Sequence, residues 1–239
     1  MSYKLDHNLI KNDMKTDTAQ TAFTDSFATL GIFVIVCILM VAGQIVAEEY
    51  SKGTIKQLLV RPYTRSKIVI SKVIATAIVV FAFMIFLAVV NTIITGIFTN
   101  SFGSLLDPII EYNYNTKSIM TLNIFTKAFF NLLAILPEVI ILLLFTVLIS
   151  ALVGNTALSV VLGFVLTVIP TMFSALIDKV KALSYIFLFN WDLSEFMFGG
   201  VPFSQYLTLP KALIVDGITI ILLIIGIIVV FKKKQIKNQ

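Results

Sequence analysis

Five long apolar runs constrain this chain more than any other feature of its sequence. They cover about residues 27–47, 68–99, 123–152, 156–177 and 211–231. Each run reaches or exceeds the roughly 20 residues that cross a ~30 Å hydrocarbon core. A soluble globule of 239 residues also needs more polar surface than a composition of 58% hydrophobic and 13% charged residues provides. The sequence therefore predicts a polytopic integral membrane protein with five spans.

The runs are almost continuously apolar, which favours helices over strands. A membrane β-barrel requires alternation with a period of two, and these runs lack it. We therefore expect an all-α fold with one transmembrane domain over residues 27–231, an outer polar segment over 1–26 and a basic tail over 232–239. The one cysteine, Cys37, lies in the first run, so no intrachain disulfide is possible.

Lysine and arginine predict the orientation, because they cluster on the cytoplasmic side of short loops. Ten of the eighteen basic residues lie in two regions, between the first two runs and in the tail: Lys52, Lys56, Arg61, Arg65, Lys67, Lys72, Lys232, Lys233, Lys234 and Lys237. Both regions belong inside, so alternation places residues 1–26, 100–122 and 178–210 outside. Either the polar N-terminus crosses unaided, or a preceding span is missing and Met1 lies in an outer loop.

The basic clusters do not indicate nucleic acid. Both flank apolar runs, and no RNA- or DNA-reading motif accompanies them. Attraction to the anionic headgroups of the lipid bilayer explains Lys232, Lys233 and Lys234.

The loop after the first run predicts a short amphipathic helix over about 51–61. Thr54 and Gln57 have the spacing of a capping box, and Pro62 closes the helix. Gly53 supplies a backbone hinge before the cap. Three apolar residues share one face at i, i+3 and i+4: Ile55, Leu58 and Leu59. An interfacial anchor without a partner is the simpler interpretation, but two defined ends beside two acidic residues favour a docking element.

This segment resembles the signature of ABC-2 type permeases, the membrane subunits of bacterial ATP-binding-cassette exporters. The matching residues are Glu48 or Glu49, Gly53, Thr54, Leu58, Leu59, Pro62, Arg65 and Lys72. The resemblance implies that residues 51–61 are a coupling helix, which docks on a separate ATPase subunit. It also implies a second permease copy or paralogue, and a bacterial plasma membrane location. Family members usually have six spans, so the five here indicate that the first span is absent.

The chain lacks the parts of a motor or an enzyme. It has no Gly-Lys-Ser or Gly-Lys-Thr phosphate loop, so ATP and magnesium would belong to the partner ATPase. Glu48, Glu49 and Lys52 faintly resemble the motif of CAAX-type intramembrane proteases. That chemistry needs histidines in the membrane, and the only one is His7 in the polar segment, so we expect no catalytic residue and no metal site.

Polar residues within the runs are candidates for a translocation path. Glu138 is the strongest candidate. A carboxylate next to Pro137 in an apolar run costs free energy, so its presence suggests a function. Asn91 and Asn131 are further candidates. A passive channel or a membrane scaffold remains the alternative function, with Thr92 and Asn155 as additional lining. The aromatic residues of segment 178–210 predict short helices at the outer interface.

Overall fold

The computed structural model describes residues 18–51, 65–113, 118–173, 177, 179–196, 204 and 206–236. Four helices are long and apolar enough to cross a membrane, over Ile70–Thr99, Ile124–Val153, Thr156–Phe173 and Leu209–Phe231. A shorter apolar helix covers Gly31–Ile45 and corresponds to the first predicted span. The prediction of a mostly helical chain with helices that could span a membrane is therefore confirmed, and the count of five spans stays a prediction.

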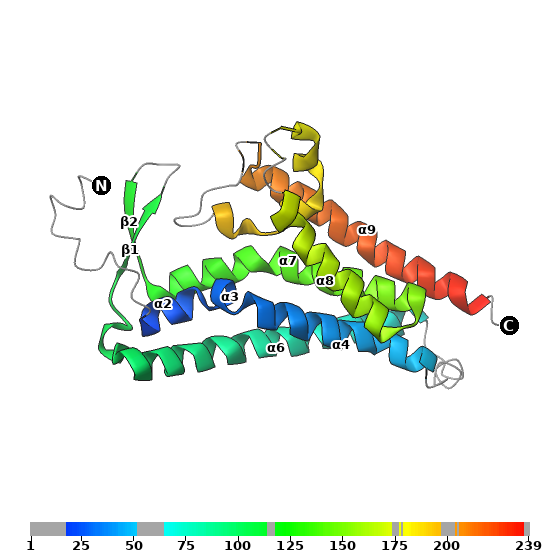
Figure 1. The fold of residues 1–239 in the computed structure, drawn as a ribbon, viewed down its shortest axis with the longest axis horizontal. Coiled ribbons are helices and arrows are strands. Elements are labelled where there is room, and N and C mark those ends of the chain that lie inside the picture. The colour runs from blue at the N-terminus through cyan, green and yellow to red at the C-terminus, as the bar shows by residue number, and fades with distance from the viewer. Residues whose placement is uncertain are drawn as a thin grey trace.

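The first helical run is broken twice. It consists of α2 (Ala19–Thr24), α3 (Ser26–Thr29) and α4 (Gly31–Ser51), which follow one another along the length of the bundle (Figure 1). A capping box begins α2, because the Thr18 side chain accepts from the Thr21 backbone and the Thr21 side chain accepts from the Thr18 backbone. Asp25 and Leu30 end α2 and α3 with non-helical backbone angles. The described part of the predicted outer polar segment, residues 18–26, is thus largely helical.

Helix α6 (Arg65–Thr99) is the longest of the described helices, at 35 residues. Asn100 ends it with a φ of 50°, and the Ser101 amide donates to the Gly96 carbonyl at 3.3 Å. This is the usual way for a helix to stop, with a left-handed residue after its last turn. The short helix η2 (Phe102–Ser104) follows. It places the Phe102 ring directly against Gly96, where the side chain of a larger residue would collide with the ring.

A β-hairpin departs from the predicted all-α fold. Strands β1 (Ile109–Asn113) and β2 (Ser118–Leu122) pair antiparallel, with Ile109 opposite Leu122 and Asn113 opposite Ser118. Both strands carry β-branched residues, and β1 also carries Tyr112, which favour extended structure. The hairpin projects from one end of the bundle, within the predicted outer region 100–122 (Figure 1).

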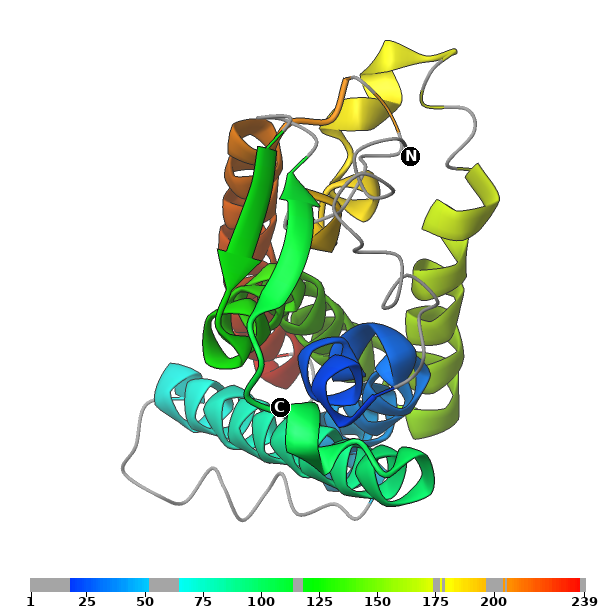
Figure 2. The same ribbon diagram turned by 90° about the vertical axis from the view of Figure 1, so that its left-hand side faces the viewer.

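Helix α7 (Ile124–Val153) lies at the centre, packed against α4, α8 (Thr156–Phe173) and α9 (Leu209–Ile236). Viewed nearly along the bundle, α8 and α9 lie on opposite sides of α7 (Figure 2). The Asn123 side chain caps the start of α7 by accepting from the Phe125 amide at 3.0 Å. Gly154, with a φ of 73°, ends the helix and makes the tight turn into α8.

The apolar core gathers around α7. Its largest fully buried side chains come from α4, α6 and α7, and include Val34, Ile38, Leu39, Val80, Met84, Ile141, Leu142 and Val147. Helix α8 approaches this core through Gly163, where any side chain would collide with Leu39 of α4 and crowd the Thr146 hydroxyl of α7. Small residues at such crossings let membrane helices pack closely.

The helix ends fall into two groups. The end of α4, the start of α6, the α7–α8 turn and the end of α9 lie at the right of Figure 1. Three short 3-10 helices lie near the end of α8 and the start of α9: η4 (Lys181–Tyr185), η5 (Phe187–Phe189) and η6 (Leu193–Phe196). They fall in the predicted outer aromatic segment, and Trp191 is buried there with its ring edge-on to Phe187.

Candidate functional site

Polar residues of α7 form a stripe along one face of its first half. Lys127, Asn131 and Glu138 are separated by four and then seven residues, so they lie near one another around the helix. Ala134 lies between them and packs in a small apolar cluster with Leu193 and Ala212. The stripe is therefore directed toward neighbouring elements.

The most buried charge of the stripe is paired. The Lys127 ammonium lies 3.2 Å from the Asp25 carboxylate, between α2 and α3. Lys127 is 6% exposed, whereas the Asp25 side chain is 36% exposed. A lysine buried to this degree at the end of a membrane helix is costly without a partner, and Asp25 compensates its charge.

Two predicted path residues meet at the break between α2 and α3. The Asn131 amide donates to the Thr24 carbonyl at 2.9 Å and to the Asp25 carboxylate at 3.3 Å. From α6, the Asn91 amide donates to the Ala22 carbonyl at 3.0 Å. A broken helix leaves backbone carbonyls without their usual donors, and these two amides supply donors to them. We call Asp25, Asn91, Lys127 and Asn131 the polar joint.

Glu138 lies two turns beyond the polar joint, next to Pro137. It is half-buried, and the nearby charged group with which it interacts electrostatically is Asp192, just before η6. Asp192 is also held in place, because its carboxylate accepts from the Ser194 amide at 2.9 Å. Two carboxylates therefore face the junction of α7 with the 3-10 segment.

A further carboxylate, Asp216 of α9, was not among the sequence candidates. It is 2% exposed, and neither of its carboxylate oxygens has a hydrogen-bond partner in the part of the chain that the structure describes. It is the only acidic residue in the predicted run 211–231, and that isolation was the signal that sequence reasoning missed.

Glu138 and Asp216 lie at similar depth in a parallel helix pair. Ala134 and Ala212 share a buried cluster near the start of the two helices, and Leu148 packs against Gly226 further along. Both pairs have the same offset in sequence, so the helices keep a constant register and place position 138 level with position 216. This level of the bundle thus carries carboxylates on both helices.

The predicted coupling segment lies mostly outside the described residues. Glu48 and Glu49 belong to the last turns of α4, and Arg65 is the first residue of α6. The remaining coupling candidates, Gly53, Thr54, Ile55, Leu58, Leu59 and Pro62, fall in the range 52–64, which the structure does not describe. The described helices therefore define both ends of the segment.

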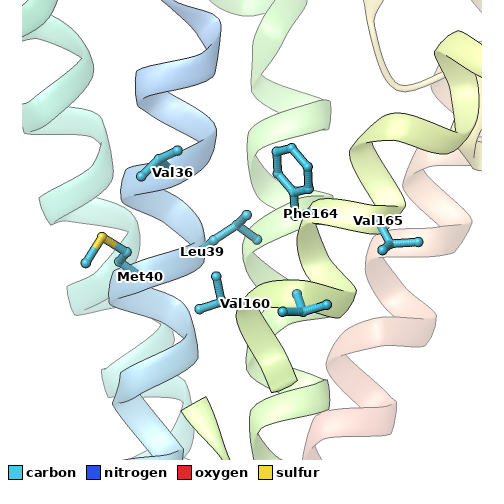
Figure 3. Close-up of a pocket in the computed structure, with 7 residues that line it drawn as sticks. Val36, Leu39, Met40, Val160, Phe164 and Val165 are labelled. Atoms are coloured by element: carbon cyan, nitrogen blue, oxygen red, sulfur yellow. The ribbon is translucent and has the colours of Figure 1, made fainter. Parts of the chain in front are cut away.

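An apolar groove lies between α4 and α8 on the surface of the bundle. It has a volume of about 240 Å³ and is lined by Val36, Leu39, Met40, Val160, Val161, Phe164 and Val165. Figure 3 shows these side chains converging from the two helices. No polar group lines the groove, so it offers nothing with which to orient a polar ligand.

Comparison with known proteins gives one relative and one family. The "Uncharacterized protein YhcI" of Bacillus subtilis (strain 168) is 26% identical over 255 residues, which cover 99% of this chain and 74% of that protein. No solved structure matches the chain significantly. The family described as "Protein of unknown function (DUF2705)" matches residues 2–237, almost the whole length. The chain therefore belongs to this family, DUF2705.

Proposed function

We propose that this chain is the permease subunit of an ATP-binding-cassette exporter, of ABC-2 type, in the bacterial cell membrane. It forms the translocation path and couples to a separate ATPase that binds ATP and magnesium. The observation that carries the proposal is the motif from Glu48 to Lys72, because its acidic, glycine, leucine-pair and proline positions resemble the coupling segment of those permeases. The chain itself performs no catalysis.

The arrangement of the helices supports a coupling role for residues 52–64. Helix α4 ends at Ser51 and α6 begins at Arg65, so the segment connects two apolar helices at one end of the bundle. The end of α9 lies at that same end, with the basic tail that we place inside the cell (Figure 1). A segment in this position meets the cytoplasm, where an ATPase would bind.

A fifth span completes the proposed topology. Helix α4 has 21 residues, which correspond to about 30 Å of helix and suffice to cross the hydrocarbon core. Its apolar portion is shorter, Gly31–Ile45, and α2 and α3 extend it toward the outer side. With α4 as a span, residues 52–64 and the basic tail lie on one side, and the hairpin lies on the other.

The carboxylates provide candidates for the path. Asn91 and Asn131 are engaged in holding the break between α2 and α3, so we assign them to positioning. Glu138 and Asp216 remain, at one level of the α7–α9 pair. Intramembrane carboxylates commonly mark substrate or ion pathways. We therefore place the path along the contact between these two helices, where a rocking motion of α9 against α7 would give alternating access.

Co-purification tests the proposal directly. The tagged chain is extracted from its native membranes in mild detergent, and mass spectrometry asks whether an ATP-binding-cassette ATPase accompanies it. We expect the ATPase to be present, and to be lost when Leu58 and Leu59 are both replaced by Asp. Lys56→Asp is the matched control, because it changes the net charge by the same amount on another face of the predicted helix. The control should retain the ATPase.

Other outcomes would overturn the proposal. A well-folded preparation without any ATPase favours the alternative of a passive channel or scaffold. Equal loss of the ATPase in the control and the double variant would show that charge, rather than the leucine face, governs the interaction.

A further inference from the structure

A second cluster of charge lies at the other end of the bundle, at the start of α9. Lys181 and Lys211 meet there with Tyr185 and Tyr206. This end carries the hairpin-side loops that the proposed topology places outside, where lysine is disfavoured by the positive-inside rule. The two lysines therefore call for a local explanation.

Lys211 is fixed by three neighbours. Its ammonium lies 3.7 Å from the centroid of the Tyr185 ring, donates to the Ser184 hydroxyl at 2.5 Å and donates to the Tyr206 carbonyl at 3.3 Å. An ammonium has three donors, and the hydroxyl and the carbonyl engage two of them, which leaves one for a ligand. Lys211 thus supplies a positive charge at a defined position without being free to move.

Lys181 contacts the ring of Tyr206, the residue whose backbone carbonyl accepts from Lys211. Its ammonium lies 5.6 Å from the centroid of the Tyr206 ring, and the residue is exposed. The Ser184 hydroxyl that accepts from Lys211 donates to the Lys181 carbonyl at 2.6 Å. Tyr206 and Ser184 therefore link the two lysines into one cluster, and the Lys181 ammonium keeps its donors available to solvent or a ligand.

The positive charge of this cluster has no counter-ion among the side chains that the structure describes. Among those side chains, the ion pair found is between Lys127 and Asp25, and neither Lys181 nor Lys211 contacts a carboxylate. The tyrosine rings attract cations but carry no charge. Lys181 lies over the Tyr206 ring and Lys211 over the Tyr185 ring, so the cluster carries two positive charges that an anion bound beside them would compensate.

The depth of the cluster identifies the anion. Lys211 is two residues from the start of the apolar span Leu209–Phe231, which is the level of the lipid headgroups. Tyrosine and lysine are the residues that favour this interface. We propose that Lys181 and Lys211, fixed by Tyr185 and Tyr206, form a phosphate-binding site that takes the phosphate of an anionic phospholipid headgroup. The site is independent of the proposed export function.

Lipid binding to the purified full-length chain tests this site. Native mass spectrometry in detergent measures retention of phosphatidylglycerol, with phosphatidylcholine as the lipid of neutral headgroup. We expect phosphatidylglycerol to be retained in preference, and Lys181→Gln to bind it about fivefold more weakly, which corresponds to about 1 kcal/mol for one lysine near a membrane surface. Lys67→Gln is the matched control, since Lys67 is an exposed lysine at the opposite end and its loss should change nothing.

Lys181→Gln is the informative variant, because no hydrogen bond of the Lys181 ammonium is found in the part of the chain that the structure describes. Lys211→Gln is measured alongside it, with thermal unfolding as a check of folding. Competition by inorganic phosphate at millimolar concentration would identify free phosphate as the ligand, and would keep the site while overturning the lipid assignment. Equal binding of the two lipids, or an equal loss in Lys67→Gln and Lys181→Gln, would overturn the site itself.

Discussion

The polar joint and Asp216 are both polar features in an apolar bundle, but only the first is satisfied. At the polar joint, Lys127 pairs with Asp25, and the amides of Asn91 and Asn131 reach backbone carbonyls of the broken helix. Asp216 is buried on α9 with both carboxylate oxygens lacking a partner among the described residues. The polar groups of the joint therefore stabilise the fold through their contacts, whereas Asp216 makes no such contact among the described residues.

This distinction reassigns the sequence candidates. A polar side chain that holds a helix break has a structural reason to be present, and needs no substrate to explain it. A buried carboxylate without a donor gives no such benefit and costs free energy. Function is therefore the better explanation for Asp216 and for its neighbour in depth, Glu138, and the polar joint is better explained by folding.

The largest effect on stability is expected from Lys127→Ala. The change removes the ion pair and leaves Asp25 without its cation, but Asp25 is partly solvated. We expect a loss of about 2 kcal/mol, below the value for a fully buried pair. Unfolding by denaturing detergent in mixed micelles measures it, with Lys67→Ala as an exposed control. If the Lys127→Ala chain were as stable as the wild type, the polar joint would not stabilise the fold.

Asn131→Ala should cost less, about 1 kcal/mol, because it removes a neutral donor from the Thr24 carbonyl and a weaker contact to Asp25. Asn91→Ala provides the matched amide on α6. Combined with Lys127→Ala, the Asn131 change should be less than additive, since both side chains contact the Asp25 carboxylate. Strict additivity in the same unfolding measurement would contradict a shared joint.

Asp216→Leu should leave stability unchanged or raise it slightly. Replacing an unpartnered buried carboxylate with an apolar residue of similar size removes its desolvation cost. Asp216→Asn keeps the shape and a polar group, and serves as the comparison. A loss of more than about 1 kcal/mol in the leucine variant would show that Asp216 has a stabilising partner after all.

Glu138→Gln is expected to have the smallest effect on stability and a visible effect on function. The amide has the shape of the carboxyl group, so the chain should still assemble with the proposed ATPase. ATP hydrolysis by the co-purified complex in nanodiscs should fall, because the path would lose an ionisable group. Unchanged hydrolysis and export in a fully assembled complex would remove Glu138 from the path.

The long helices were predictable because their cause is local. An apolar run of about 20 residues has few alternatives in a membrane, so the runs at 68–99, 123–152 and 211–231 correspond to α6, α7 and α9. The turn at Gly154 also has a local cause, because glycine readily takes the positive φ found at this helix end.

The broken start of the first helix was not predictable in the same way. Residues 19–24 are too polar to be counted in an apolar run, and their helix depends on contacts with α6 and α7, which are distant in sequence. The hairpin was missed for a different reason. Its two five-residue strands are too short and too irregular in pattern to stand out between the long apolar runs, and their pairing joins residues on either side of a connection.

Glu138 was predicted from the sequence as a residue of the candidate site, but the residues around it were not. Asp216 could have been found from the same reasoning about carboxylates in apolar runs. The different roles of Asn131 and Glu138 could not be predicted from the sequence. Whether the Asn131 amide caps a broken helix depends on where that helix breaks, which the sequence does not show. Burial and partners, rather than residue type, decide between a structural and a functional role.

The most direct test of the account is the sidedness of the two ends of α6. In a Cys37→Ser background, single cysteines replace Lys56 in the proposed coupling segment and Asp107 before the hairpin. A membrane-impermeant maleimide should label position 107 in intact cells, and position 56 only after the membrane is permeabilised. Labelling of position 56 from outside would place the proposed coupling segment away from any cytoplasmic ATPase and contradict the permease assignment.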